Sequence, residues 1–483
     1  MTAGFVCLLA QPLAAAVHLK ARTIEALSAR SEKLNHHFII QFRSAPTPET
    51  RAELERRGIR VVAYVPDNAV MASSHAVPDL EGLDVEWTGN LAPSDKLSPE
   101  LSAAASGAYL LMLHEDVARP AGLKIAQRLG FFVLDRPGLV PGHLVIAGPA
   151  QNLAELAAHD EVAYILPASP DLLTDQPLIG CVGSLTPAGR MGPYAAAAQG
   201  WIAAADGMVH LNFVFETLTP KVEENALRSE MGRALGEWAQ YANVTFSAAG
   251  TPSSPRTVAI RFASGEHGDG FPFDGPGKVL AHSFYPAPPN SEPIAGDMHL
   301  DADEDWRIGA NIDLFSVALH EAGHTLGLGH TDKPGSVMYP YYRLVTGLSP
   351  DDIAAIRNLY GSKAPVTPPG PAQPPTGPPS APGKPIEPPP AADRTPPSLR
   401  VVSPASSIVS TTSGSMTFSG TAVDNVGVAA VRWSTSTGKS GTASGTTNWS
   451  AEVPLLIGDT VVTIRAYDAA GNSAWKAITV VRH

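Results

Sequence analysis

The sequence predicts a multidomain protein with tandem α+β modules near its N-terminus, an α/β domain in the middle and an all-β sandwich at its C-terminal end. Three observations lead to this prediction. The chain has 483 residues, whereas single domains cluster around ~100 to 150 residues. One succession of strand and helix patterns occurs twice before residue 171, and a proline-rich stretch separates two later regions of different periodicity.

The expected boundaries follow these changes in pattern and composition. Fifteen of the 33 residues from 365 to 397 are proline, which is typical of an extended spacer with a rise of ~3.1 Å per residue. In chain order, the segments are a signal peptide (1–18), a first ferredoxin-like module (33–98), a second ferredoxin-like module (105–170), a linker or activation segment (171–206), the α/β domain (207–361), the proline-rich linker (362–397) and the sandwich (398–483).

Composition narrows the class of protein. An apolar run at residues 5–9 and small residues at 14–16 predict a signal peptide, although a basic n-region is missing, so we expect a secreted protein. The two cysteines, Cys7 and Cys181, are too few for a disulfide framework. A net charge of −12 without a basic tract argues against nucleic acid as a partner. We expect no membrane span, because no apolar run reaches 18 residues.

The N-terminal part contains an internal repeat. Residues 37–42 resemble residues 109–113, and each copy continues with a helix, two strands, a short helix (77–83 and 152–158) and a closing strand. This is a ferredoxin-like order. The modules resemble the tandem N-terminal prodomains of bacterial subtilisin-like proteases, which implies a chaperone and latency role. A plain interaction or spacer domain is the alternative.

The middle region has the periodicities of an α/β domain. Residues 209–215 and 258–262 alternate as strands, and residues 222–242 between them show helical spacing of apolar side chains. Asp313 is a suitable N-cap for a further, largely apolar helix, and residues 348–360 predict the last helix of the domain.

His320, Glu321, His324, Gly327 and His330 have the spacing of a catalytic zinc site. On a helix, the first two histidines lie one turn apart on the same face, with Glu321 beside them as general base. Gly327 can adopt a left-handed conformation, end the helix and return His330 as the third ligand, which leaves the fourth position to water. The alternative is a pair of surface histidines beside a glycine-rich helix end. Because five residues have the required offsets, this alternative is the weaker one.

A second motif follows His330. Residues 336–340 predict a tight turn that places the Met338 thioether beneath the zinc ligands. Together, the two motifs resemble the matrixin family, the matrix-metalloproteinase branch of the metzincins, over residues 209–361. The resemblance implies a metzincin α/β fold and an S1′ pocket lined by Pro340 and Tyr342. Core packing is the alternative for this tyrosine.

The resemblance also implies a structural zinc site upstream of the catalytic motif. Its ligands are His267, Asp269, His282 and His299. Three imidazoles and one carboxylate close a tetrahedral shell without a position for water, which suits a structural ion. An acidic Gly/Pro loop with solvated carboxylates is the alternative, and four candidate ligands in the family order favour zinc.

The same comparison implies a calcium site in this loop, because calcium prefers hard oxygen ligands in flexible segments. The expected ligands are three carboxylates and nearby carbonyls: Asp274, Gly275, Gly277, Val279, Asp301 and Glu304. The family's second calcium is not predicted. Thr257 stands where an aspartate ligand is usual and Pro293 replaces a glycine, although Asp297 remains a candidate ligand.

Cys181 is a candidate latency switch. Matrixins are kept latent by a cysteine thiolate in the fourth zinc position, and zinc deprotonates a coordinating thiol. Cys181 lies in the linker where such a switch belongs but lacks the family's Pro-Arg-Cys-Gly-Val-Pro-Asp motif, so an ordinary linker thiol is the alternative. In the family, an aspartate of the pair corresponding to Asp351 and Asp352 holds the new N-terminus after activation, and helix capping is an equal alternative.

Residues 398–483 predict a β-sandwich. Short alternating segments recur between Gly, Ser and Asn turns, for example at residues 415–419 and 461–467. The pattern resembles bacterial Ig-like modules. Attachment to a cell surface or matrix is one interpretation and an inert end is the other.

These observations predict a secreted, extracellular zinc metalloendopeptidase, made as a zymogen, that binds Zn²⁺ and Ca²⁺. It would hydrolyse protein and peptide substrates with zinc-activated water and Glu321 as base. The alternative is a cell-surface adhesion protein with an inactive protease scaffold. The intact Glu321 argues against it, because a scaffold without activity tends to lose its base.

Overall fold

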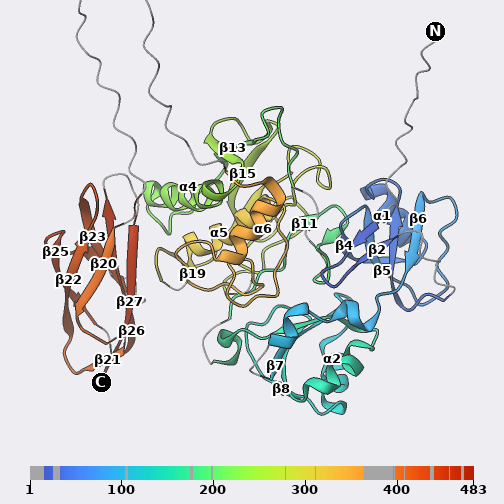
Figure 1. Cartoon of the computed structure of the whole chain (residues 1–483), viewed down its shortest axis with the longest axis horizontal. Coiled ribbons are helices and arrows are strands. Elements are labelled where there is room, and N and C mark those ends of the chain that lie inside the picture. Colours follow the sequence, from blue (N-terminus) through green and yellow to red (C-terminus); the bar gives the residue numbers. More distant parts are fainter. Residues whose placement is uncertain are drawn as a thin grey trace, which may run out of the picture. The chain divides into compact units, whose positions relative to one another are not determined.

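The computed structural model describes residues 16–25, 33–103, 107–174, 178–196, 200–277, 279–310, 312–363, 395, 397–406, 408–435, 440–455, 457–468 and 473–483. The chain divides into two compact units, Met1–Asp305 with Ser316–Ser362 and Trp306–Phe315 with Lys363–His483. Most of the predicted signal peptide and of the proline-rich linker therefore lies outside the described residues. Figure 1 shows the chain coloured along its sequence.

The first N-terminal module is an antiparallel sheet of order β4-β5-β3-β6. Its elements are β3 (His37–Phe42), α1 (Pro48–Arg56), β4 (Arg60–Val65), β5 (Ala69–Ser73) and β6 (Val85–Gly89). The helix predicted at residues 77–83 is wrong, because this segment forms only turns and irregular backbone. Pro78 restricts the preceding residue, and Gly82 has a φ of +76°, so neither residue favours a continuous helix. The hairpin of β1 (Ala16–His18) and β2 (Thr23–Glu25) precedes this module, so β1 lies within the predicted signal peptide.

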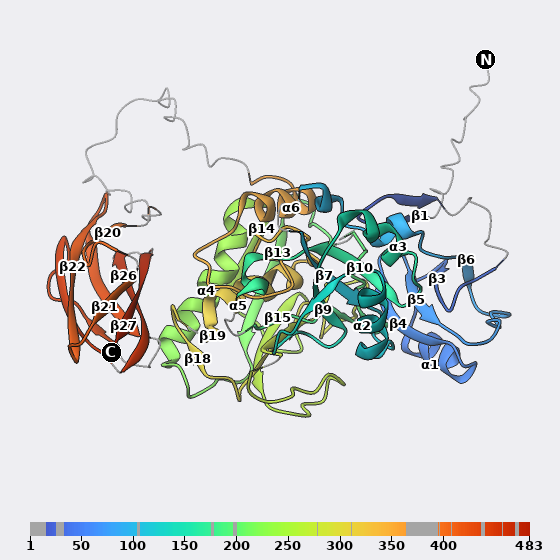
Figure 2. The ribbon, with the colours of Figure 1, turned by 90° about the horizontal axis from the view of Figure 1, so that it is seen from below.

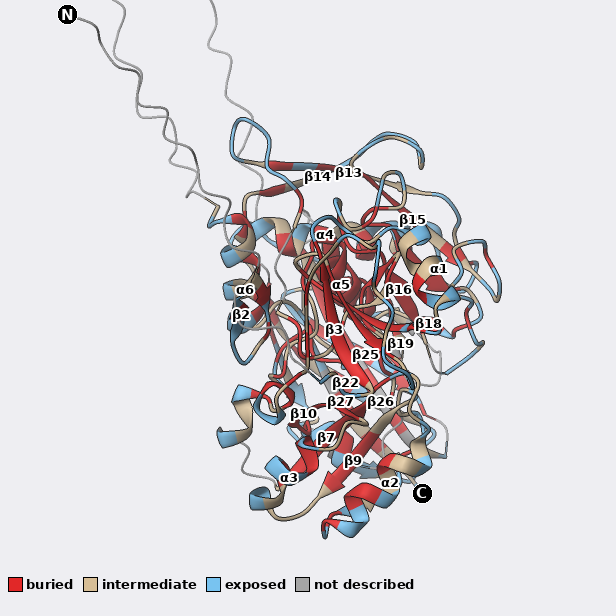
Figure 3. Cartoon of the chain, turned by 90° about the vertical axis from the view of Figure 1, so that its right-hand side faces the viewer, coloured by how far each residue is buried: buried red, intermediate tan, exposed pale blue. Residues whose placement is uncertain are grey.

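The second module repeats this arrangement with sheet order β10-β7-β9-β8. Its elements are β7 (Ala108–Leu113), α2 (Arg119–Arg128), β8 (Phe132–Leu134), β9 (His143–Ala147), α3 (Leu153–Ala157) and β10 (Val162–Pro167). Figure 2 shows β7, β9 and β10 side by side, and Figure 3 shows α2 and α3 with exposed outer faces. The inner faces bury Ile125, Ala126, Leu153 and Leu156 on the sheet. Short 3₁₀ helices flank the module: η1 (Pro93–Lys96), η2 (Pro99–Ala103), η3 (Ala150–Asn152) and η4 (Pro170–Leu173).

The α/β domain contains a mixed sheet of order β14-β13-β15-β17-β16. Strands β13 (Val209–Phe215), β14 (Val244–Ala248), β15 (Thr257–Ala263) and β17 (Met298–Asp301) are parallel, and β16 (Ala281–Ser283) is antiparallel at one edge. The hairpin of β11 (Leu185–Thr186) and β12 (Gly189–Arg190) precedes this sheet in the chain. The antiparallel edge strand carries His282, which places this predicted zinc ligand directly opposite His299 on β17.

Three helices complete this domain: α4 (Glu224–Tyr241), α5 (Leu314–Thr325) and α6 (Pro350–Tyr360). The buried residues of α4 include the apolar positions with helical spacing, among them Met231 and Trp238. Trp238 Nε1 donates to the carbonyl of Leu319 in α5 at 2.8 Å, so the two helices are joined through buried side chains. Helix α5 begins directly after Asp313 and is buried along its whole length.

The second unit has two sheets around one core in residues 398–483. The sheet orders are β20-β22-β25 and β21-β27-β26-β23-β24. Their strands are β20 (Ser398–Ser403), β21 (Ile408–Thr411), β22 (Ser415–Val423), β23 (Val428–Thr435), β24 (Ser440–Thr442), β25 (Asn448–Pro454), β26 (Gly458–Asp468) and β27 (Ser473–Arg482). Phe418, Trp449 and Ile464 lie in the shared core. Strands β18 (Trp306–Arg307) and β19 (Ile312–Asp313) form a short separate pair. Among the described residues, every helix is too short or too polar to cross a membrane.

Candidate active site and metal centres

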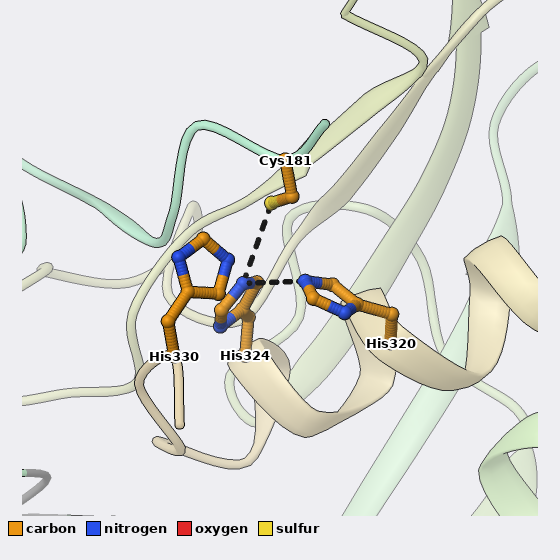
Figure 4. A group of neighbouring side chains, drawn as sticks. All are labelled: Cys181, His320, His324 and His330. Carbon is orange, nitrogen blue, oxygen red and sulfur yellow. Dashed lines mark hydrogen bonds between the residues drawn. The ribbon is translucent and has the colours of Figure 1, made fainter. Parts of the chain in front are cut away.

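Helix α5 and the turn after it bring three imidazoles together. His320 and His324 lie one turn apart, with ring centroids 4.8 Å from each other. Gly327 follows with a φ of +91°, the left-handed conformation that a helix end of this kind requires. The chain then turns back and places the His330 ring 5.3 Å from His320 and 5.0 Å from His324 (Figure 4).

The hydrogen bonds of these rings orient their free nitrogens toward one point. Nδ1 of His320 donates to the carbonyl of Val337 and Nδ1 of His324 to that of Leu328, both at 2.7 Å. Their Nε2 atoms lie 3.1 Å apart, and Nε2 of His330 is buried without a hydrogen-bond partner among the described residues. Backbone acceptors on the far nitrogen are typical of histidines that bind a metal.

Burial keeps these histidines neutral. It lowers the pKa of His320 and of His324 to about 4 and that of His330 well below its usual value. Neutral imidazole is the form that binds a metal. Three neutral imidazoles, two of them fully buried, whose ligand atoms lie within 4.8 Å of one another therefore fit a zinc ion.

Glu321 is completely buried and held from two sides. The Ser283 hydroxyl donates to Oε2 at 2.8 Å, and the Tyr342 hydroxyl donates to Oε1. For Tyr342 the sequence predicts a substrate pocket or core packing rather than a contact with Glu321, and it does not single out Ser283. The position of Ser283 next to His282 was the one signal that could have found it.

Cys181 reaches this centre from the linker. Its Sγ lies 3.5 Å from Nε2 of His324 (Figure 4). The thiol also donates to Oε1 of Glu321 at 3.6 Å. Its ligand atom and those of the three histidines all lie within 4.8 Å of one another. Burial, and then the charge of Glu321, raise the pKa of Cys181 well above its usual value, and a cation at this point would favour its thiolate.

The backbone around Cys181 is aligned with the segment after Met338. Cys181 N donates to the carbonyl of Pro340 at 2.9 Å, and Tyr342 N donates to the carbonyl of Ile179 at 2.8 Å. Gly180 also forms an antiparallel bridge with Tyr341 and a parallel bridge with Val279. The linker therefore lies as an extended segment between the two chain segments that flank the histidines.

The predicted methionine turn packs directly against α5. A Cβ added to Gly323 would lie 2.3 Å from Sδ of Met338, so this helix position has room only for glycine. Asp352 fixes the turn, because it accepts from Val337 N at 2.9 Å and also caps α6 by accepting from Ser349 N at 2.9 Å. Asp351 instead pairs with Lys333. In this form of the chain, both aspartates therefore have other partners than a chain terminus.

The four candidate ligands of the second zinc site also meet. Oδ2 of Asp269 lies 2.7 Å from Nε2 of His267, 2.8 Å from Nε2 of His282 and 2.7 Å from Nδ1 of His299. Nδ1 of His267 faces the carbonyl of Gly265 at 2.8 Å, which leaves Nε2 for a metal. All four side chains belong to the α/β domain itself.

The candidate calcium ligands lie around the adjacent loop. Gly277 N donates to Oε1 of Glu304 at 2.6 Å, and Val279 N donates to Oδ1 of Asp274 at 3.3 Å. Asp301 is fully buried. Burial and the neighbouring carboxylates Asp303 and Asp274 raise the pKa of Asp301, so a cation here would relieve charge repulsion. Gly275, with a φ of +78°, belongs to the same loop.

The second N-terminal module contacts the loops on either side of Met338. Tyr164 OH donates to Oδ2 of Asp332 at 2.6 Å, and Lys20 forms an ion pair with the other oxygen of Asp332. Tyr339 OH donates to the carbonyl of Pro167 at 3.0 Å, and Tyr341 OH lies 2.9 Å from Nδ1 of His143. These contacts join the module to the loop that follows His330 and to the predicted substrate wall.

Two parts of the chain match known protein families. Residues 201–361 match the matrixin family, and residues 12–92 match a domain family of unknown function, DUF8729. Karilysin of Tannerella forsythia is 42% identical over 146 residues, which are 30% of each chain. Stromelysin-2 of Rattus norvegicus is 40% identical over 160 residues, 32% of each chain, and human matrix metalloproteinase-16 is 37% identical over 173 residues, 33% of this chain and 28% of its own.

The chain therefore spans about a third of the length of the curated relatives that it matches. The matrixin resemblance predicted from the motifs is confirmed for the α/β domain, which implies a metzincin fold there. The match lies in the part of the chain that carries all three zinc-motif histidines.

Proposed function

We propose that this chain is a zinc-dependent metalloendopeptidase, secreted in a latent form, that cleaves extracellular proteins. The observation that carries the proposal is the convergence of His320, His324 and His330 on one point beside a buried Glu321. The matrixin match of the same region supports the class of enzyme.

The chemistry follows from the positions of these side chains. The three histidines would hold a zinc ion, which would supply a Lewis acid to activate a water molecule. Glu321 takes a proton from this water as it attacks the peptide carbonyl and delivers a proton to the leaving nitrogen. Ser283 and Tyr342 keep the carboxylate oriented, and its burial excludes other water molecules.

We assign structural roles to the other two ion sites. His267, Asp269, His282 and His299 would hold a second zinc in a closed shell, which their mutual distances support. The loop carbonyls of Gly275, Gly277 and Val279, with Asp274, Asp301 and Glu304, would hold calcium, which the buried carboxylates of Asp301 and Glu304 beside this loop support.

We further propose that the N-terminal part keeps the enzyme latent. Cys181 would supply the fourth ligand as a thiolate, and the segment around it would block substrate entry. The contacts of Tyr164, Tyr339 and Tyr341 would hold the second module over the site. Both module sheets have the strand order of a ferredoxin-like fold, which supports the assignment of two ferredoxin-like modules.

The two-sheet arrangement of residues 398–483 supports an Ig-like assignment. We propose that this module attaches the enzyme to a cell surface or matrix. A pull-down of the purified module on whole cells and on insoluble matrix tests this; retention on neither would contradict the proposal.

The activity is tested with the processed wild-type chain and its Glu321→Ala variant on casein and gelatin. We expect cleavage by the wild type only, with equal zinc content in both proteins. Cleavage that survives the substitution would contradict Glu321 as the base. Binding to cells together with no cleavage by the wild type would instead favour an adhesion protein with an inactive scaffold.

A further inference from the structure

A third cluster of histidines and carboxylates lies where the two N-terminal modules meet. His36 and His37 come from the start of β3 in the first module, and Asp116 and Asp160 flank β7 and β10 in the second. Ligand atoms of His36, His37 and Asp116 lie within 4.8 Å of one another. The matrixin domain contributes none of these side chains.

His37 is the centre of this cluster and is almost completely buried. Its Nδ1 lies 2.6 Å from Oδ2 of Asp160, and its Nε2 lies 2.9 Å from Oδ1 of Asp116. A carboxylate on the far nitrogen is the arrangement that orients metal-binding histidines in proteins. With Asp160 in this role, Nε2 of His37 is directed to the point that Asp116 also faces.

The other two groups are oriented in the same manner. Nδ1 of His36 lies 2.8 Å from the carbonyl of Ser74, which leaves its Nε2 for a ligand. Asp116 accepts from the Ser73 hydroxyl at 2.6 Å through Oδ2, so its other oxygen faces His37. His37, His36 and Asp116 are thus each held by a further partner that is not one of the three ligands.

The distances in this cluster match those of the second zinc site. The contact of 2.9 Å between His37 and Asp116 compares with 2.7 to 2.8 Å between Asp269 and its histidines. In a tetrahedral site, donors about 2.0 to 2.2 Å from the ion lie about 3.3 to 3.5 Å apart, so a bound ion would separate His37 and Asp116 slightly. Both clusters place an imidazole and a carboxylate in direct contact.

The cluster also has an open side. His36 lines a surface hollow of about 610 Å³ together with Ser74 and His75. A metal ion could enter from this hollow and keep a water molecule there as its fourth ligand. A site of two imidazoles and one carboxylate suits zinc better than calcium or magnesium, which prefer oxygen alone.

We propose that His36, His37 and Asp116 bind a zinc ion that links the two N-terminal modules. The ion would join β3 of the first module to the loop after β7 of the second, and would stabilise the latent chain because it binds only when the modules are assembled. The proposal does not depend on peptidase activity.

The test uses the full chain with Glu321→Ala, which prevents self-cleavage, dialysed against micromolar free zinc. Zinc per chain is measured by mass spectrometry in this parent and in its His36→Gln and Asp116→Asn derivatives. His75→Gln is the matched control, because His75 stacks on the His36 ring at 4.3 Å without being one of the three ligands. His37 is left unchanged, since it holds both aspartates and its loss could unfold the modules.

We expect the parent and the His75→Gln control to hold one more zinc ion than the other two variants. Added zinc should also raise the Tm of the parent and the control more than that of the His36→Gln variant. Equal zinc contents in all four proteins would overturn the proposal and leave His37 as an imidazolium between two carboxylates. Failure of the peptidase assay would not affect this result.

Discussion

The two proposed zinc centres of the α/β domain differ in where their fourth ligand comes from. In the closed centre, Asp269 and three histidines all belong to the domain. In the catalytic centre, the domain supplies three histidines and the remaining position faces Cys181 of the linker. A centre that is complete within its domain can stabilise the fold, whereas one completed by a removable segment can be switched.

This difference is also electrostatic. The closed centre contains an anion of its own, Asp269, against the imidazoles. The catalytic centre has only neutral imidazoles as ligands within the domain, and the nearest carboxylate, Glu321, is engaged by two hydroxyl groups. In the proposed latent form, the thiolate of Cys181 would supply the negative ligand that the catalytic centre lacks within the domain.

The largest effect is expected at the closed centre. Asp269→Ala should remove one zinc ion per chain and leave three buried imidazoles without their anion, which should lower the free energy of unfolding by roughly 3–5 kcal/mol. Zinc analysis and urea unfolding at equilibrium measure both quantities. Cys181→Ala is the matched control, and an equal loss of stability in the two variants would remove the distinction between the centres.

Cys181→Ala should act on activity instead. If the thiolate contributes about 2.7 kcal/mol to the latent state, its removal should raise the activity of the unprocessed chain about a hundredfold. The assay is cleavage of a fluorogenic peptide by unprocessed protein, with the absence of processing confirmed by mass. The processed enzyme should be unaffected by the same substitution. An unchanged basal rate would identify Cys181 as an ordinary buried thiol.

The hydrogen bonds that hold the Glu321 carboxylate predict a smaller effect on activity. Ser283→Ala removes one of its two hydrogen-bond donors and should lower kcat of the processed enzyme about tenfold, or about 1.4 kcal/mol, with KM unchanged. Ser283→Thr keeps a hydroxyl and should restore most of the rate. If the alanine variant raised KM with kcat intact, Ser283 would act in substrate binding.

The parts of these centres that could be predicted from sequence are those set by local geometry. His320 and His324 follow from the helical repeat, and the return of His330 follows from the conformational freedom of Gly327. The family resemblance extended the prediction to Asp269 and its partners. The internal repeat also misled, because it predicts a helix at residues 77–83 that the structure does not contain.

Contacts between distant segments could not be predicted in this manner. Ser283 and Glu321 are separated by 38 residues, and Tyr164 and Asp332 by 168. Such pairs depend on how β16 lies against α5 and on how the second module sits on the domain. Neither relation leaves a periodic signal in the sequence, since a single hydroxyl in a strand is compatible with many arrangements.

The smallest expected effect concerns the attachment of the second module. Tyr164→Phe removes the hydroxyl that donates to Asp332 but keeps the ring in the core, so the module should still fold. The free energy of its contact with the α/β domain should fall by about 1.5 kcal/mol. The basal activity of the unprocessed chain should then rise about tenfold, less than for Cys181→Ala. Lys20→Met, which removes the ion pair with the other oxygen of Asp332, is the companion variant and should have a weaker effect, because this pair is partly exposed to solvent. A rise in basal activity equal to that of Cys181→Ala would mean that the module, rather than the thiol, maintains latency.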